Sequence, residues 1–387
     1  MKSLLLSLRD VLVSLKLTVV LLVFSMLLVF VATLDQVNLG IWAVQAKYFR
    51  SFIVYSRIGD LTIPIFPGGY LVGGLLLANL IAGHIYRWGF QLRKAGIILT
   101  HFGLILLLVG ELLSGLWQKE YHLRLSEGET RSYAESFREN ELVIMDITDP
   151  KFDDVVALPE PLLARKAEVQ HPRLPFRVVP KAYYPNADLL RRTDATRPAV
   201  ATTGFGTTLD AIPQPVTHRE DQRNLPAAFV ELVAPDQSLG TFLVSLQLVM
   251  PQDFTYGGRT WRIMLRTARA YYPFSLKLLK FTHDRYPGTE IPKNFSSRLR
   301  LQTPDGRDDR EVLVYMNNPL RYAGLTFYQA GFENNDTTTV LQVVRNPSWL
   351  IPYIACALMS LGLLVQFSIH LVGFARRRRR APQPAAA

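Results

Sequence analysis

Four long apolar runs dominate the pattern of hydrophobic and polar positions along the chain. Each is long enough to cross a membrane as a helix, and they cover about residues 17–34, 68–88, 95–117 and 349–374. Asp35 and Gln36 follow the first run, where a cleavage site would need small residues. We therefore expect this run to be a membrane helix, and the pattern predicts three such helices near the N-terminus and one near the C-terminus.

A long segment of mixed character separates the third and fourth runs. Its short stretches alternate between apolar and polar residues and are divided by turn formers such as 256–258 (Tyr-Gly-Gly) and 304–306 (Pro-Asp-Gly). Such alternation is typical of half-buried antiparallel strands. The predicted fold is thus four transmembrane α-helices (three plus one) with a large, mainly antiparallel β domain between helices three and four. Residues 185–222 show little periodicity and are predicted to be a long loop.

Three regions follow from this pattern. Residues 1–117 form an N-terminal membrane domain, residues 118–347 an extracytoplasmic β-rich domain, and residues 348–387 a C-terminal helix with a basic cytoplasmic tail. Glycines at 96, 103 and 110 in the third helix recur every seven residues. Small residues also recur in the second helix, at 69, 73, 74, 78 and 82. Small residues let membrane helices approach closely, so we expect both faces to pack against neighbouring helices.

The segment between the first two helices carries an apolar stripe at helical spacing, formed by Ile41, Val44, Tyr48, Phe49 and Phe52. This spacing predicts a short helix lying on the outer membrane surface. The alternative is a helix whose stripe is buried within the protein.

The basic residues mark one end of every predicted span. They form three clusters: Lys2, Arg9 and Lys16; Arg87, Arg93 and Lys94; and Arg376–Arg380. Lys and Arg gather on the cytoplasmic side of membrane helices. We therefore expect both termini in the cytoplasm and the β domain outside, as in a bacterial inner membrane. The clusters hold nearly all of the net charge of +11, so a nucleic-acid partner is not expected.

The chain contains a single cysteine, Cys356, which lies in the fourth predicted span. No intrachain disulfide, CxxC redox pair or CxxCH haem-attachment motif can be formed. This excludes a thiol oxidoreductase and a c-type cytochrome.

Three histidines fall near the cytoplasmic ends of the spans. His101 lies about 10 Å deep, counted from Lys94, and His370 about 9 Å deep, counted from Arg376, at 1.5 Å per residue. His84 lies nearer the interface. Ionisable residues inside a span usually face protein or a ligand, and neutral imidazole is an axial ligand of haem iron. The ligand candidates are, in falling order, His101, His370 and His84, with interfacial hydrogen bonding as the alternative for each.

His101 is about opposite the glycine face of its helix, and its own face is apolar, which suits either a haem macrocycle or lipid. Met359, Gln366 and His370 share one face of the fourth helix, which is predicted to look inward. Glu111, nearer the outer end of the third helix, is expected to contact a partner, a proton path or a neighbouring helix.

Three segments resemble the ResB family of cytochrome c biogenesis proteins. They are residues 93–104 (RKAGIILTHFGL), 281–289 (FTHDRYPGT) and 317–330 (NNPLRYAGLTFYQA). The order of three spans, an external domain and one span is also that of the family. The external motifs combine bulky aromatics with turn formers, which favours a packed β core; His283, within one of them, is a candidate for haem contact outside.

The resemblance implies a role in system II cytochrome c maturation. ResB proteins act with a ResC (CcsA)-type membrane protein to bring haem to the outer face, where it is attached to apocytochrome c; a thiol-reducing ResA-like protein is a further expected partner. The family's span-three histidine, a ligand of non-covalent haem b, matches His101, and its opposite ligand is expected from the partner. An in-chain pair of His101 and His370 is the alternative.

The chain has only five tryptophans and no tryptophan-rich loop, so it fits the ResB half alone, a non-catalytic or co-catalytic subunit of a haem-lyase complex. Two other classes remain open from the residues themselves. One is a membrane-anchored assembly scaffold without cofactor, and the other is a b-haem electron-transfer subunit.

Overall fold

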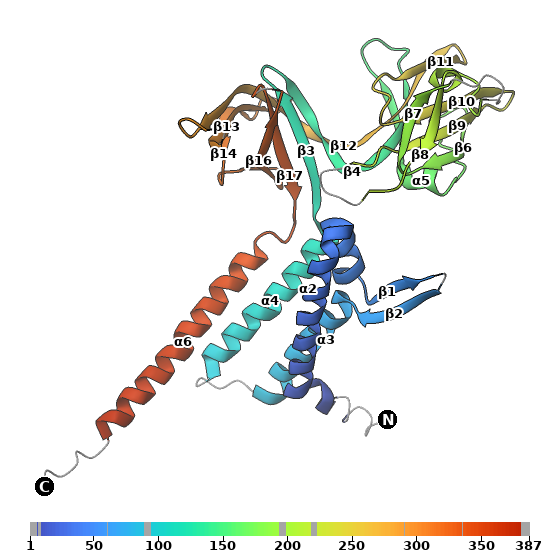
Figure 1. Cartoon of the computed structure of the whole chain (residues 1–387). Coiled ribbons are helices and arrows are strands. Elements are labelled where there is room, and N and C mark those ends of the chain that lie inside the picture. Colours follow the sequence, from blue (N-terminus) through green and yellow to red (C-terminus); the bar gives the residue numbers. More distant parts are fainter. Residues whose placement is uncertain are drawn as a thin grey trace, which may run out of the picture. The chain divides into compact units, whose positions relative to one another are not determined.

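The computed structural model describes residues 6, 9–59, 61–88, 94–192, 199–217, 223–289, 291–334 and 336–380. These residues form two compact units (Figure 1). Unit 1 contains the described residues up to Gln118 and from Asn346 onward, and unit 2 contains those between Lys119 and Arg345. Lys2, Arg93 and the tail after Arg380, on which the sequence predictions draw, lie outside the described residues.

Unit 1 is built from helices and one β-hairpin. In chain order these are α2 (Leu15–Val44), η1 (Gln45–Phe49), β1 (Ile53–Ile58), β2 (Leu61–Pro67), α3 (Gly69–Gly83), η2 (His84–Trp88), α4 (Ala95–Trp117) and α6 (Ile351–Arg380). Four helical segments are long and apolar enough to cross a membrane: Leu15–Phe49, Gly69–Tyr86, Ala95–Trp117 and Ile351–Arg377.

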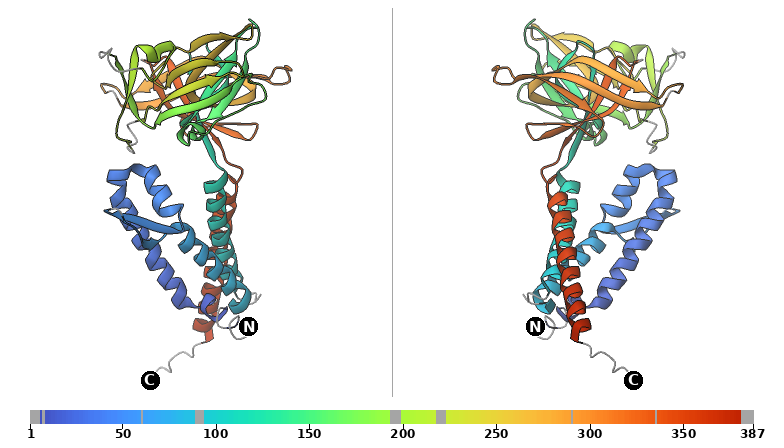
Figure 2. Two further views of the ribbon diagram at one scale, coloured as in Figure 1. Left: turned by 90° about the vertical axis from the view of Figure 1, so that its right-hand side faces the viewer. Right: turned by 90° about the vertical axis from the view of Figure 1, so that its left-hand side faces the viewer.

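The glycine face of α4 packs directly against α6 (Figure 2). A Cβ atom added at Gly96 would lie 2.6 Å from Gln366, and one at Gly103 would lie 2.6 Å from Met359. At Gly110, the same atom would lie 2.7 Å from Ile351. These distances leave no room for a side chain, so the seven-residue spacing is the reason the two helices lie so close.

The small residues of α3 follow the prediction only in part, since Ala82 is buried and a Cβ atom at Gly69 would lie 2.5 Å from the Phe49 carbonyl oxygen. A Cβ atom at Gly73 or Gly74 would meet nothing within 4 Å. The buried face of α3 instead contains Val72, Asn79 and Ala82. Asn79 fixes α3 beside the start of α2, because its Oδ1 accepts a 2.7 Å hydrogen bond from Thr18 and its Nδ2 donates to the Leu12 carbonyl at 2.6 Å.

The segment after the first span also differs from the predicted surface helix. A kink at Gly40, with φ of 72°, turns the chain within α2. Beyond the kink, the residues of the predicted stripe continue in helical conformation to the end of η1. Val44 and Tyr48 are buried against Leu28 and Ala32 of α2, which matches the alternative of a buried stripe. The β1–β2 hairpin then follows, in a region where the sequence pattern had predicted no strand.

Unit 2 is mainly antiparallel β structure. Its strands are β3 (Lys119–Ser126), β4 (Thr130–Asp146), β5 (Asp154–Pro159), β6 (Arg177–Tyr184), β7 (Ala187–Arg191), β8 (Leu209–Pro213), β9 (Ala227–Val233), β10 (Ser238–Ser245), β11 (Gln252–Tyr256), β12 (Arg259–Arg285), β13 (Pro292–Gln302), β14 (Asp309–Tyr315), β15 (Leu320–Tyr322), β16 (Leu325–Glu333) and β17 (Thr338–Arg345). The short helices α5 (Glu160–Ala164) and η4 (Gly204–Thr207) accompany them.

The strands form one large sheet and two smaller ones. The large sheet runs in the order β14-β13-β12-β4-β3-β17-β16-β15, with β11 beside β12 and β5 beside β4. The order β10-β9-β6 makes a second sheet, and β7 pairs with β8. The predicted long loop over 185–222 therefore contains a two-stranded sheet and η4 among its described residues.

Two hydrophobic cores share the long strand β12. Its first half contributes Trp261 and Ile263 to a core that also contains β6, β9 and β10. Its second half contributes Leu276 and Leu278 to a core formed with β3, β13 and β17. Unit 2 thus consists of two lobes joined by β12 and β4, as Figure 1 shows. The fold prediction is confirmed to this extent: four apolar helices and a large, mainly antiparallel β unit.

Candidate functional site

His101 lies on the face of α4 that turns away from α6. Its Nδ1 is 2.8 Å from the carbonyl oxygen of Ile97, one helical turn earlier. A carbonyl can only accept a hydrogen bond, so this contact assigns a proton to Nδ1 and leaves Nε2 as the nitrogen that could ligate a metal ion. Metal-bound histidines commonly donate their second ring nitrogen to a backbone carbonyl, which fixes the tautomer and the ring orientation. His101 is therefore held in a tautomer that can ligate iron through Nε2.

The structure brings His84 to His101. His84 is the first residue of η2, directly after α3, and the centres of the two imidazole rings are 5.6 Å apart, with an edge-to-face angle of 62°. Figure 2 shows α3 and α4 approaching each other toward the ends that carry these residues. The wider π-helical turn of η2 lies at this point of approach, and π-helical turns occur often at functional sites.

His370 lies elsewhere along the bundle. Gly96 faces Gln366, and Gly103 faces Met359, so this antiparallel register places His101 level with about residue 361 of α6. His370 is then roughly 13 Å further along the helix, at 1.5 Å per residue. Its side chain is exposed, and its Nε2 is 2.8 Å from Nε2 of Gln366.

The structure therefore does not bring together His101 and His370, the alternative in-chain pair. Both histidines were predicted at the same depth because each depth was counted from a basic residue that was taken as the end of its span. In the structure, α6 continues as a helix past that point to Arg380. The predicted inward face of α6 holds for Met359 and Gln366, which contact the α4 glycines, but it ends before His370, because α4 begins at Ala95.

The His84–His101 pair brings together two imidazoles, the kind of group that ligates haem iron. Two imidazoles that bind one metal ion through bonds of about 2 Å each have ligating nitrogens about 4 Å apart. The ring centres of His84 and His101 are 5.6 Å apart and the rings meet edge to face, so one ring must turn and the pair must open to take one iron between them. The exposed side chains near the pair are also apolar, with Ile85 at 65%, Phe102 at 52% and Leu104 at 38%. Glu111, two to three turns further along α4, is exposed.

His283 in unit 2 is part of a different arrangement. Its side chain is 2% exposed, and its Nδ1 is 2.9 Å from Oδ1 of Asp336. The other carboxylate oxygen of Asp336 accepts a 2.9 Å hydrogen bond from Arg285. The ring of Phe332 packs at 4.3 Å from the imidazole. These contacts hold the His283 side chain beneath Asp336 and Arg285, whose own side chains are 32% and 40% exposed, and its role as a haem contact stays a prediction.

The external motif at residues 317–330 forms a tight hairpin. Ala323 and Gly324, with φ of 49° and 76°, make the turn between β15 and β16. Leu320, Leu325 and Phe327 are buried in the core of the same lobe. Ala323 adopts a backbone conformation that L-residues rarely take. Most of this motif is therefore packing and turn chemistry, as the aromatic and turn-forming residues predicted.

His122 of β3 is a second partly buried imidazole in unit 2. Its ring lies 5.5 Å from that of Phe137. Burial lowers the pKa of His122, and the nearby Arg124 adds to this effect. The side chain is therefore neutral at pH 7 and serves packing.

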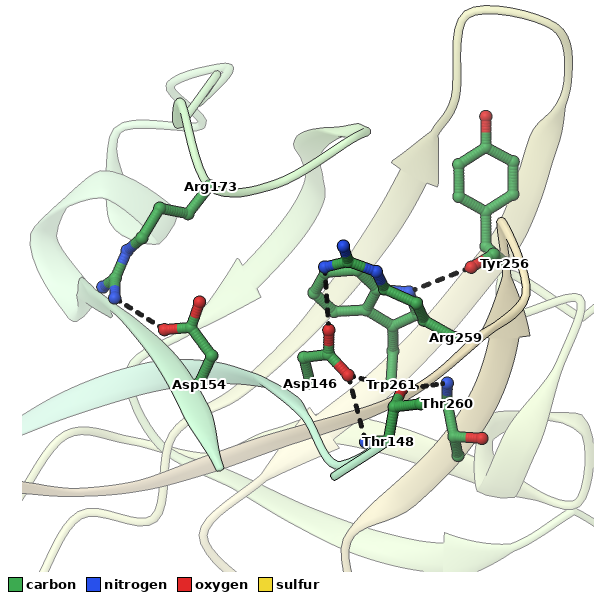
Figure 3. Close-up of polar contacts among 8 residues, drawn as sticks. All are labelled: Asp146, Thr148, Asp154, Arg173, Tyr256, Arg259, Thr260 and Trp261. Atoms are coloured by element: carbon green, nitrogen blue, oxygen red, sulfur yellow. Dashed lines mark hydrogen bonds and ion pairs between the residues drawn. The ribbon is translucent and has the colours of Figure 1, made fainter. Parts of the chain in front are cut away.

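A surface hollow of about 710 Å³ in unit 2 is lined by four aspartates and Arg259. Figure 3 shows that three of these charged residues, Asp146, Asp154 and Arg259, have partners within the protein. Asp146 accepts hydrogen bonds from Thr148 and, at 3.0 Å, from Arg259, and Asp154 pairs with Arg173 at 2.6 Å. The Thr148 and Arg259 contacts lower the pKa of Asp146. Three of the five charged residues that line the hollow are thus paired within the protein, and His84 and His101 remain the candidate centre.

Comparison with known proteins gives a family match within unit 2. Residues 249–340 match the ResB-like family. Protein NrfI of Wolinella succinogenes is 36% identical over 92 residues, which are 24% of this chain and 10% of NrfI. The chain thus shares only a small part of the length of that relative. These matches confirm the resemblance to the ResB family, and together with the four apolar helices they indicate a membrane protein.

The matched segment contains β11 to β16, and it includes His283 and the hairpin motif. It does not include His84, His101 or His370. Sequence reasoning ranked His84 last because it lies nearest the interface, where an imidazole often only hydrogen-bonds, and its contact with His101 depends on how α3 and α4 approach each other. Both histidines lie within about ten residues of the predicted connection between the second and third spans, His84 before it and His101 after it. This placement was the feature of the sequence that could have indicated their contact.

Proposed function

We propose that this chain is a ResB-like subunit for cytochrome c maturation that binds haem b in the membrane at His101, with His84 as the second imidazole. The family match supports a role in cytochrome c biogenesis. The observation that carries the haem proposal is the contact of the two imidazole rings, with His101 in the tautomer that can ligate iron.

The described residues support a capture step from the cytoplasmic leaflet. With the basic clusters in the cytoplasm, the two histidines lie in the inner half of the membrane, at the end of the bundle where α3 and α4 meet. Iron-porphyrin is apolar over most of its area, so it can enter from the lipid between these helices. His101 then ligates the iron, and His84 turns to take the opposite face.

Delivery to the outer face requires a partner, because this chain has no tryptophan-rich loop. We propose a ResC (CcsA)-type membrane protein that accepts haem and presents it outside to apocytochrome c, whose thiols a ResA-like protein keeps reduced. Unit 2 would support that transfer from the outer side of a bacterial inner membrane. In this scheme, a ligand from the partner replaces His84 when haem moves outward.

Absorption spectra of the full chain, purified in detergent from haem-replete cells, test this proposal. We expect a reduced b-type signal and one non-covalent haem per chain at most, measured as the pyridine haemochrome. His101→Ala should lower the haem content at least ten-fold. The matched control is His370→Ala, which removes another histidine of the same membrane unit and should leave the haem content unchanged.

The outcomes separate the possible ligand sets. An unchanged b-type signal in His101→Ala would remove this residue from the proposal. Loss in His101→Ala with no change in His84→Ala, in haem content or spin state, would assign the opposite ligand to the partner. Equal haem in all three variants would place the iron at other residues, and a wild-type chain that carries no haem would favour an assembly scaffold without cofactor.

The imidazole pair also favours a second candidate, a b-haem electron-transfer subunit, because such proteins bind one haem between two in-membrane histidines. The two functions differ in the fate of the haem. A biogenesis subunit should lose its bound haem to apocytochrome c when the ResC-type partner is present, whereas an electron-transfer subunit should retain it. Pulse-labelled haem followed on a denaturing gel measures this difference.

A further inference from the structure

One buried polar residue connects α3 to α2. Asn79 is 6% exposed and lies in an otherwise apolar part of its helix. A buried amide costs free energy unless its donors and acceptors find partners. The Oδ1 atom of Asn79 accepts a hydrogen bond from Thr18 at 2.7 Å, and its Nδ2 donates to the carbonyls of Leu12 at 2.6 Å and Ser14 at 3.2 Å. All three bonds run from α3 to the region where α2 begins.

The helical hydrogen bonding of the chain is interrupted just before α2. Ser14, the N-cap of α2, has an extended ψ of 128°, and its hydroxyl accepts a 3.2 Å hydrogen bond from the N–H of Lys16. In an unbroken helix, that N–H would bond to the carbonyl of Leu12, four residues earlier. The interruption therefore frees the Leu12 carbonyl, and the amide of Asn79 is the donor that bonds to it.

The same helix leads directly to His84, five residues after Asn79. At about 1.5 Å and 100° per residue, His84 is about 7.5 Å further along the helix and about 140° around its axis. Asn79 therefore faces α2, whereas His84 faces α4, where its ring centre is 5.6 Å from that of His101. A shift of α3 at the Asn79 contact would be passed on to the imidazole pair.

The end of α3 that carries His84 has room to move. A Cβ atom added at Gly83 would meet nothing within 4 Å, in contrast to the packed glycines of α4. Tyr86 of η2 lines a surface hollow of about 450 Å³ together with three residues of the N-terminal segment, Arg9, Asp10 and Val13. Close backbone packing therefore does not fix this end of α3, and the bonds of Asn79 are the polar contacts that hold it to α2.

We propose that Asn79 is a positioning residue of the haem site, and that its bonds to the chain before α2 set where His84 lies relative to His101. With these bonds intact, the two imidazoles are in contact. Without them, α3 is free to shift, and the iron loses its second imidazole. The N-terminal segment thereby controls ligation by His84. The ligand role of His84 rests on the proposed function, whereas its position is independent of haem.

Distances between spin labels in the full chain without haem test the positioning. In a Cys356→Ser background, nitroxides on Ile85→Cys and Leu112→Cys report the separation of η2 and α4, because these side chains are 65% and 41% exposed. Double electron–electron resonance in nanodiscs should give one narrow distance distribution. We expect Asn79→Leu, which removes every hydrogen bond at similar bulk, to widen the distribution at least two-fold. The matched control is Asn38→Leu, the same change at an exposed position of α2, which should leave it unchanged.

The haem-loaded chain gives a second readout, the spin state of the iron. Thr18→Val removes the hydroxyl that bonds to Asn79 and nearly preserves the shape of the side chain. It should raise the high-spin fraction at least three-fold, measured by absorption spectroscopy. Thr18→Ser keeps the hydroxyl and should match wild type. This pair separates the loss of a hydrogen bond from a change in packing, and it still tests the proposal if Asn79→Leu does not fold.

Two results would overturn the proposal. One is a distance distribution that stays unchanged in Asn79→Leu, and the other is a high-spin fraction that is the same in Thr18→Val and Thr18→Ser. A wild-type chain that binds no haem would instead refute the proposed function. In that case, the spin-label distances would still decide whether Asn79 positions His84.

Discussion

The two faces of α4 bring it close to its neighbours in different ways. The glycine face meets α6 along most of its length, at distances that leave no space for even a methyl group. The opposite face meets α3 near one end, where the His84 and His101 rings are in contact. The first contact is close because side chains are absent, and the second is close because two polar side chains meet.

The two faces of α4 therefore have different roles: one holds the helix against α6, and the other carries the candidate ligand His101. Glycine packing holds α4 and α6 as a rigid pair, since backbone atoms are in contact and small shifts are resisted. The α3–α4 contact is local and rests on side chains that can rotate. A cargo can therefore enter between α3 and α4 without separating α4 from α6. This division would suit the haem capture and release that we propose.

The largest expected effect comes from filling the glycine face. In Gly103→Ala, the new Cβ would lie 2.6 Å from Met359 and 2.8 Å from the Ala355 carbonyl, so the helices must move apart. We expect a loss of about 1–3 kcal/mol in the free energy of unfolding. Unfolding of the full chain in detergent by increasing SDS, followed by circular dichroism, measures this loss.

Gly115→Ala is the matched control on the same helix. A Cβ atom at Gly115 meets nothing within 4 Å, so its stability should be unchanged or slightly higher, because alanine favours a helix over glycine. Equal destabilisation of both variants would show that the cost belongs to glycine replacement in general and not to contact with α6.

The two faces also differ in how well the sequence predicted them. The spacing of Gly96, Gly103 and Gly110 depends only on helical periodicity, so the packing face followed directly from the residues. The His84–His101 contact depends on the π-helical turn of η2 and on the approach of two helices, neither of which has a periodic signal. His370 was misplaced because span ends were counted from basic residues, although helices continue past them.

The hairpin was not predicted for a related reason. Pro64 and Pro67 end helices and usually mark loops, and the segment was interpreted accordingly. In the structure they occupy the outward positions of an edge strand, where proline costs no hydrogen bond. In unit 2, by contrast, alternation and turn residues predicted the mainly antiparallel fold, since strands of period two with polar turns leave a local trace.

An effect of intermediate size is expected from changes to the contact between His84 of η2 and His101 of α4. His84→Ala removes one of the two rings in contact and leaves the α4–α6 pair intact. We expect the haem content of the purified chain to fall about ten-fold, with a change from low-spin to high-spin iron in the haem that remains. Unfolding in SDS should stay within about 0.5 kcal/mol of wild type. A drop in stability as large as that of Gly103→Ala would instead mean that His84 holds the bundle together.

The smallest effect is expected at His370, which belongs to neither face. Its side chain is exposed and lies beyond the first residue of α4. Among the residues that the structure describes, its hydrogen bond is to Gln366. In His370→Ala, Gln366 keeps its position beside Gly96, because backbone and Cβ contacts hold it there. Stability should change by less than about 0.5 kcal/mol, and the b-type spectrum should be the same as in wild type. If haem is lost from this variant while SDS unfolding is unchanged, the iron would have to be bound at the far end of α6, and the contact between α3 and α4 would then have no part in holding the cargo.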